Sequence, residues 1–197
     1  MSTQLDTGLD TGLDELPALT PAGQRLLDAA SDLFYDRGIR AVGVDLISET
    51  AGTTKKTLYD RFGSKDALVA LYLRRRALRW QEFLTGRLEE SGPDAADQVP
   101  AVFDALESWH EESERGCAFV NAYAELGGHD HPALAVIRAE KQSMHDLFVR
   151  LAADEQVGNL LHLVYEGALV QATAAGLPEA IPRAREAATD LIRRRPA

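Results

Sequence analysis

Apolar residues recur at helical spacing along most of the chain after residue 20. In the first predicted helix the apolar face consists of Leu26, Leu27, Ala30, Leu33 and Phe34. A threonine followed by proline, Thr20-Pro21, is a typical helix start, and Gly38 is a typical helix end. This segment therefore predicts an amphipathic helix with one buried face.

The same reasoning predicts helices over about residues 44–51, 54–62, 64–90, 96–112, 118–126, 132–153, 155–175 and 178–194. Thr54 and Ser64 are the expected N-caps of the helices that they begin. No segment shows sustained period-two alternation, so we expect an all-α fold without a sheet. The stretch Ser91–Asp94 is the best interior linker. We expect an acidic, disordered tail over 1–19, a first domain over 20–66 and a helical domain over 67–197.

The net charge of -10 is unevenly distributed. Residues 1–20 carry a net charge of -4, residues 21–76 carry +3, and the remainder carries -9. Only the middle segment suits a polyanionic partner, and its phosphate contacts must come from local placement. The single cysteine, Cys117, excludes an internal disulfide framework and a cysteine-based zinc cage, which favours a reducing cytoplasm. The sequence shows no signal peptide and no membrane-spanning run.

Two short predicted helices meet at Gly52, as a helix-turn-helix requires. Hydroxyl and ammonium groups gather at the start of the second helix, where such modules meet base edges and phosphates: Thr53, Thr54, Lys55, Lys56 and Thr57. Tyr59 and Lys65 follow. These groups predict DNA binding. The alternatives are a helical hairpin with merely solvated lysines, and a core position for Tyr59.

The run from Arg25 to Leu71 resembles the N-terminal domain of the TetR family. Its most specific part, 57–68, has the family's pattern of Leu-Tyr, two residues, Phe, then Ser-Lys and an acid. The resemblance implies a three-helix helix-turn-helix domain, joined by a long helix to a C-terminal ligand-binding and dimerisation domain. It also implies that Tyr59 and Lys65 contact phosphates while Thr54, Lys55 and Lys56 lie nearest the bases.

One position departs from the family pattern. Where the family usually has threonine or serine capping the second helix, this chain has Val42-Gly43. A side-chain phosphate contact is therefore absent there, and the backbone N–H at Gly43 is expected to replace it.

Aromatic and polar residues in the second half predict a site for a small, largely apolar or aromatic effector. The candidate residues are Phe103, Trp109, Cys117, Asn121, Tyr123, His162 and Tyr165. Most of them could instead simply pack the core. A redox role for Cys117 is disfavoured, because a lone cysteine in an apolar context is more often inert.

Two apolar stripes near the end of the chain predict a homodimer. The interface candidates are Leu160, Leu161, Val164, Ala168, Ala184, Ala188 and Leu191. Paired with a second copy, these segments would form a four-helix bundle, the interface that the resemblance implies. The alternative is that both stripes belong to the core of one protomer.

Other chemistries are weakly supported. His129-Asp130-His131 could ligate a metal, but the segment looks more like a turn before a helix, and no metal or cofactor is expected. Phosphate-binding loops and nucleophile motifs are lacking, which argues against an enzyme. The sequence thus predicts a regulator, more often repressor than activator in such families, which binds palindromic operator DNA as a dimer until an effector enters. The alternative is a DNA-binding protein controlled by a protein partner or without an effector.

Overall fold

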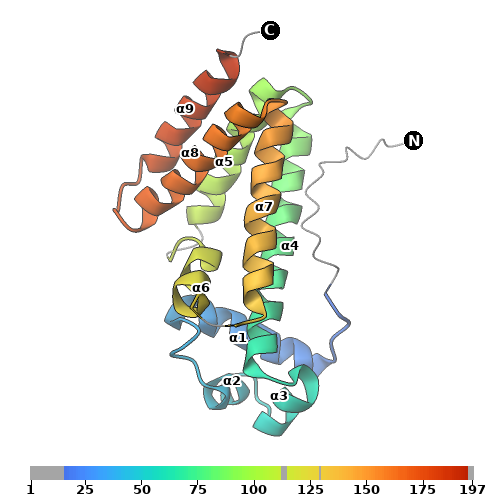
Figure 1. The fold of residues 1–197 in the computed structure, drawn as a ribbon. Helices are drawn as coiled ribbons and strands as arrows, with labels where there is room; N and C mark the ends of the chain where they lie inside the picture. The colour runs from blue at the N-terminus through green and yellow to red at the C-terminus, as the bar shows by residue number, and fades with distance from the viewer. Residues whose placement is uncertain (1–15, 112–114, 129, 195–197) are drawn as a thin grey trace, which may run out of the picture. The chain divides into compact units, whose positions relative to one another are not determined.

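The structure, a computed structural model, describes residues 16–111, 115–128 and 130–194. Within these ranges the chain forms nine α-helices and no strand (Figure 1). The helices are α1 (Pro21–Arg37), α2 (Val44–Thr50), α3 (Lys55–Phe62), α4 (Lys65–Ser91), α5 (Ala95–Glu111), α6 (Ala118–Leu126), α7 (Ala133–Ala152), α8 (Glu155–Thr173) and α9 (Ala180–Arg193). The predicted all-α fold is confirmed. Most of the predicted tail, residues 1–15, lies outside the described residues.

Side-chain caps fix the starts of several helices. The hydroxyl of Thr20 accepts a hydrogen bond from the Gly23 amide over 3.3 Å, at the start of α1. Ser64 Oγ accepts from the Ala67 amide over 3.0 Å, at the start of α4. Both caps were predicted, because a capping side chain acts within its own turn of the chain.

The helices group into two compact units. The N-terminal unit comprises the described residues of 12–78 and 117–139, and the C-terminal unit comprises those of 79–116 and 140–197. α4 and α7 therefore contribute to both units, and α6 belongs to the N-terminal one. The functional boundary expected at residue 66 stays a prediction.

The N-terminal unit has an apolar core to which α1, α2, α3, α4, α6 and α7 contribute. Its fully buried side chains include Leu26, Ile47, Leu58 and Leu68. Burying one such side chain stabilises the fold by about 1.5–3 kcal/mol. α1 packs against both α2 and α3, so the two short helices rest on a longer one (Figure 1).

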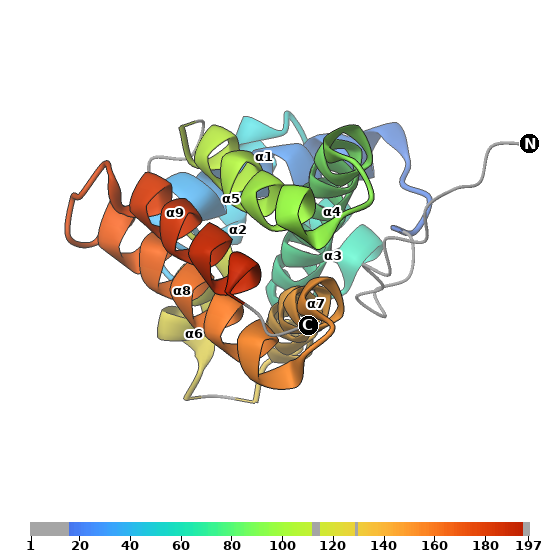
Figure 2. The ribbon, with the colours of Figure 1, turned by 90° about the horizontal axis from the view of Figure 1, so that it is seen from above.

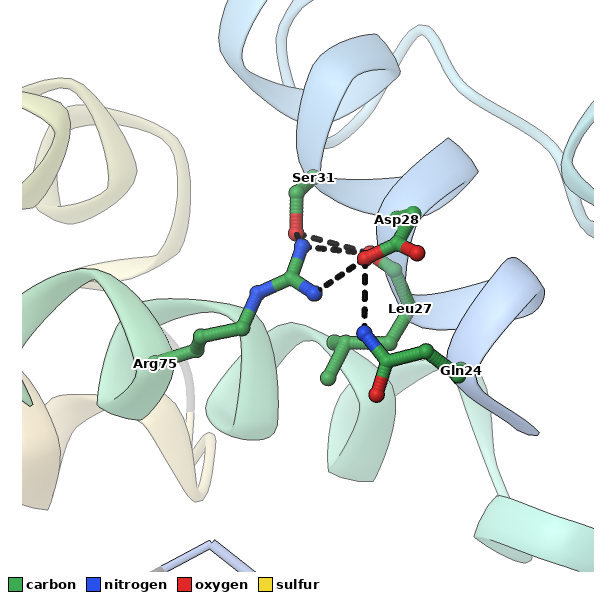
Figure 3. Close-up of polar contacts among 5 residues, drawn as sticks. All are labelled: Gln24, Leu27, Asp28, Ser31 and Arg75. Atoms are coloured by element: carbon green, nitrogen blue, oxygen red, sulfur yellow. Dashed lines mark hydrogen bonds and ion pairs between the residues drawn. The ribbon is translucent and has the colours of Figure 1, made fainter. Parts of the chain in front are cut away.

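Arg75 joins α4 to α1 inside the N-terminal unit (Figure 3). Its guanidinium donates to Asp28 Oδ1, to Ser31 Oγ and, over 3.1 Å, to the carbonyl oxygen of Leu27. Gln24 donates to the same Asp28 oxygen over 2.9 Å. A planar guanidinium suits this set because its fixed donors reach several acceptors together.

In the C-terminal unit α9 packs against α5 and α8 (Figure 2). Phe103, Phe148 and Tyr165 form an aromatic cluster, with the Phe148 and Tyr165 ring centroids 5.5 Å apart. A second cluster joins Trp80, Phe83 and Trp109. Throughout the described part of the chain, no helix is both long and apolar enough to cross a membrane.

Candidate nucleic-acid interface

A tight turn sets α3 at an angle to α2. Gly52 has a φ of +60°, a conformation that costs little only for glycine, and the Thr53 amide donates to the carbonyl oxygen of Ser48 over 2.9 Å. Arg25 on α1 holds the turn from outside, because its Nε donates to the Ala51 carbonyl oxygen over 3.2 Å. The turn is therefore fixed by backbone conformation and by one long-range bond.

α3 is anchored by one apolar side chain and leaves most of its surface open. Leu58 is fully buried, whereas Lys55 and Lys56 are exposed and Tyr59 is 48% exposed. The alternative core position for Tyr59 is therefore wrong. Thr54 caps the helix, since its hydroxyl accepts from the Thr57 amide over 3.1 Å. The helix consequently exposes ammonium and phenol groups, while Leu58 and the Thr54 cap hold it in place.

Thr53 is placed differently from its neighbours. Its side-chain oxygen is buried and has no hydrogen-bond partner among the described residues, and the residue as a whole is half-buried. Because the chain turns at Gly52, the Thr53 hydroxyl points inward instead of joining the exposed row. A DNA contact from Thr53 stays a prediction, and in the conformation described its hydroxyl is buried.

Lys65 also departs from the expectation of a free phosphate ligand. Its Nζ donates to the Ile39 carbonyl oxygen over 2.6 Å and lies 5.8 Å from the centre of the Phe34 ring. Partial burial lowers the pKa of this ammonium. A phosphate contact from Lys65 stays a prediction, and it requires Nζ to share or leave the Ile39 carbonyl.

The lysines of α3 are paired with carboxylates on the same surface. Lys55 Nζ lies 2.6 Å from Asp45 Oδ1, and Lys56 Nζ lies 2.6 Å from Asp60 Oδ2. The hydrogen bond and charge of Asp45 raise the pKa of Lys55. All four side chains are more than half exposed, so water and salt screen these pairs and phosphates can compete for the ammonium groups.

The loop between α1 and α2 is clamped by a residue from α6. Glu125 Oε1 accepts from the Ile39 amide over 3.0 Å, and Oε2 accepts from the Arg40 amide over 2.6 Å. The same loop leads to Gly43, the N-cap of α2, which has open space around its Cα. Sequence reasoning missed Glu125, because nothing near it in the chain signals a partner 86 residues away.

Comparison with known proteins agrees with this geometry. Residues 26–72 match the family model described as bacterial regulatory proteins of the tetR family. SCO4454, a TetR-family transcriptional regulator from Streptomyces coelicolor, superimposes with a TM-score of 0.81 at 30% sequence identity, covering 88% of this chain and 89% of that one. The chain belongs to the TetR family of transcriptional regulators.

The curated relatives include both an activator and a repressor of transcription. The chain is 45% identical over 124 residues to the transcriptional activator FasR of Mycolicibacterium smegmatis, which covers 63% of this chain and 48% of the relative. It is 34% identical over 92 residues to the repressor KstR2 of Rhodococcus jostii, covering 43% of each. The chain thus spans about half the length of these curated relatives, whose names describe transcriptional regulators.

The predicted effector residues of this TetR-family chain fall into both units. Phe103 and Tyr165 belong to the buried aromatic cluster, and the His162 ring lies 6.3 Å from that of Phe148. Trp109 is half-buried in the second aromatic cluster. In the N-terminal unit, Cys117 and Asn121 are half-buried and Tyr123 is 53% exposed. A common site for all seven stays a prediction.

The predicted dimer residues separate into two groups. Leu160, Val164, Ala168 and Ala184 line an open groove of about 390 Å³ on α8 and α9, together with Leu163, Gly167, Gln171, Leu177, Ala180 and Arg183. Leu161 and Ala188 are fully buried in the protomer, so they offer no exposed surface here, and their interface role stays a prediction. Leu191 is half-buried and is not among the groove residues.

The histidine motif before α7 has a structural role. His131 Nδ1 accepts from the Ala133 amide over 3.1 Å, and its Nε2 lies 3.4 Å from Asp66 Oδ1. His129 lies outside the described residues. In the described part of the chain, no group of three or more histidine, cysteine or acidic side chains is arranged to hold a metal ion.

Proposed function

We propose that this TetR-family regulator is a repressor that binds palindromic operator DNA as a dimer, through α3, and releases it when a small molecule binds the C-terminal unit. The observation that carries the DNA-binding proposal is the exposed row on α3 above a single buried anchor. Thr54, Lys55, Lys56 and Tyr59 are exposed, whereas Leu58 holds the helix to the core.

The chemistry of this surface supports a division of roles. Lysine ammonium and threonine hydroxyl groups at a helix N-terminus can donate to base edges in the major groove. The exposed Tyr59 hydroxyl and the amide groups that follow Gly43 at the start of α2 can donate to phosphate oxygens. Phosphate contacts fix the register of the protein, and contacts from Lys55 and Lys56 to bases select the sequence.

The face of α8 and α9 supports assembly with a second copy. Leu160, Leu163 and Leu177 are exposed by 40–68%, and the groove that they help to form is lined mainly by apolar and small residues. Exposed apolar side chains clustered at a groove are typical of protein interfaces. A two-fold dimer across this face contains two copies of α3, as a palindromic operator with half-sites about 34 Å apart requires.

The buried rings of the C-terminal unit support control by a small molecule. An effector that binds better to a dimer with mismatched α3 spacing would shift the population away from the DNA-bound form. Repression follows where the operator overlaps a promoter. A reporter gene behind the operator should be silent with the protein and active after effector is added, whereas expression that rises with the protein would identify an activator.

DNA binding is tested with the full chain. Purified protein should retard a fragment from the region around its own gene, and Lys56→Ala should weaken binding to this fragment about ten-fold and reduce the preference for it over unrelated duplex. The matched control is Arg193→Ala, because Arg193 is an exposed cation on α9. Failure to retard any genomic fragment, or equal effects of both variants, contradicts the role of α3.

Assembly is tested by light scattering coupled to gel filtration. The chain should elute as a dimer, and Leu163→Glu should shift it toward the monomer because a carboxylate would be buried in the interface. Val120→Glu places the same charge at an exposed apolar position on α6 and should leave the dimer intact. A monomeric wild-type chain, or dissociation by both variants alike, would exclude the α8–α9 interface.

A further inference from the structure

The packing of α7 against α8 holds ionisable groups that neutralise one another unequally. Lys141 Nζ lies 2.8 Å from Glu166 Oε1 but 3.4 Å from Glu140 Oε2. Of the two carboxylates, Lys141 thus lies closer to Glu166. His162 adds a ring nitrogen 3.6 Å from the same Glu166 oxygen. Of the two carboxylates, Glu140 therefore has the more distant positive charge beside it.

Glu140 is also the more deeply buried carboxylate. Its residue is only 4% exposed, and burial raises the pKa of its carboxyl group. An ionised carboxylate removed from water costs several kcal/mol unless a cation or hydrogen bonds compensate. Lys141, at 3.4 Å, offsets this cost only in part, so Glu140 favours a bound proton or a further cation.

Three buried side-chain atoms here make no hydrogen bond within the described part of the chain, although two of them lie near an ion-pair partner, Lys141 or Glu166. They are Glu140 Oε2, Ser143 Oγ and His162 Nε2. Ser143 follows Glu140 by three residues on α7, so both side chains lie on one face of that helix, and Ser143 is 6% exposed. Buried polar groups are nearly always satisfied in folded proteins, so this cluster suits a polar guest.

Aromatic rings border the cluster. The His162 ring lies 6.3 Å from that of Phe148, which lies 5.5 Å from Tyr165 and 6.0 Å from Phe103. Ring faces carry partial negative charge and attract cations in dry surroundings. Carboxylates beside aromatic rings favour a positively charged organic group over a negatively charged one.

We propose that Glu140, Ser143 and His162 form the polar end of the effector site, and that the effector is a protonated amine with an aromatic or apolar body. The ammonium donates to Glu140 Oε2 and Ser143 Oγ, and the apolar body lies against Phe148 and Tyr165. A carboxylic acid is disfavoured by Glu140 and Glu166, and an alcohol supplies hydrogen bonds without charge. This inference rests on the effector-controlled regulator proposed above.

Three probes with one aromatic body and different head groups test the proposal by calorimetry on the full chain: phenylethylamine, phenylethanol and phenylacetate. The amine should bind about ten-fold more tightly than the alcohol, because a charge-assisted hydrogen bond is about twice as strong as a neutral one, and phenylacetate should bind weakest. Glu140→Gln should reduce amine affinity to that of the alcohol. Glu186→Gln, at an exposed position on α9, is the matched control and should change neither affinity.

Equal binding of amine and alcohol, preference for phenylacetate, or no binding of any probe overturns the inference. If circular dichroism shows that Glu140→Gln does not fold, the head-group series on the unmodified chain still decides the question. The DNA assay without probe separates the two proposals. Operator binding with no preference for the amine defeats only this inference, whereas amine preference without operator binding defeats the proposed function and leaves the site standing.

Discussion

Arg25 on α1 and Ala51 at the end of α2 are joined by a hydrogen bond of 3.2 Å, from the guanidinium Nε to the backbone carbonyl. The bond spans 26 residues and fixes the last turn of α2 just before the chain reverses at Gly52. A single side chain of the supporting helix therefore holds the turn that leads to α3.

Loss of this bond should weaken both the fold and DNA binding. Arg25→Ala is expected to lower the free energy of unfolding by about 1 kcal/mol, the size of an ordinary hydrogen bond at a partly exposed site. In a chain of this size that corresponds to a fall in Tm of about 2–4 °C. Arg25→Lys keeps the charge but not the planar donor and should behave like Arg25→Ala in urea denaturation; wild-type stability of the lysine variant would show that charge alone matters.

Replacement by alanine should destabilise the protein at one of the two glycines that flank α2 and have little effect at the other. Gly52 has a φ of +60°, whereas Gly43 has a φ of -85°, and a Cβ at either position would meet nothing within 4 Å. Gly52→Ala should therefore cost about 1–2 kcal/mol through backbone strain alone. Gly43→Ala should change stability by no more than about 0.5 kcal/mol in the same denaturation series. Equal losses in the two variants would contradict the backbone explanation.

Glu125 should protect the amides of the loop between α1 and α2 from exchange. It accepts from Ile39 and Arg40, so Glu125→Ala should accelerate hydrogen exchange at these amides by about ten-fold or more, as expected when bonds worth about 1–2 kcal/mol are lost. Glu125→Gln keeps one oxygen acceptor and should give an intermediate rate. Unchanged protection in the alanine variant would show that the loop is held by other contacts.

His145 should make stability depend on pH. Hydrogen bonds with Asp146 and Asn159 raise its pKa above 6.5, and Glu155 adds to the effect. A raised pKa in the folded state means that the stabilisation is complete below about pH 6.5 and disappears as pH rises through the folded value. The wild type should therefore lose stability relative to His145→Gln between about pH 6 and 8, by a modest amount because the side chain is partly exposed and solvent screens its interactions. Parallel urea profiles for the two proteins would contradict this role.

Local sequence signals predicted the starts of several helices, but they did not predict contacts between residues far apart in the chain. Thr20, Thr54 and Ser64 were identified as caps because each acts on an amide three residues ahead. Arg75 binds Asp28, which lies 47 residues away in the chain, and no periodic pattern in the sequence predicts such a pair. The fold class follows from local pattern, whereas the contacts that lock the helices together follow from tertiary packing.

The candidate sites show the same limit. Periodicity marks α8 as apolar, but it cannot tell which apolar positions face the protomer's own core. Leu161 is fully buried and Leu163 is 68% exposed, although both are leucines on the same helix. Likewise, the polar character of Thr53 suggested exposure, whereas the turn at Gly52 buries its hydroxyl.

The carboxylates beside the lysines of α3 bear on how the protein would search a genome. Lys55 and Lys56 each already have a counterion in the chain, and the whole chain carries a charge of -10. Random duplex would therefore release few bound ions and attract the protein only weakly. Fewer molecules would be sequestered on the millions of irrelevant sites, so a small number of copies per cell could keep a true operator occupied.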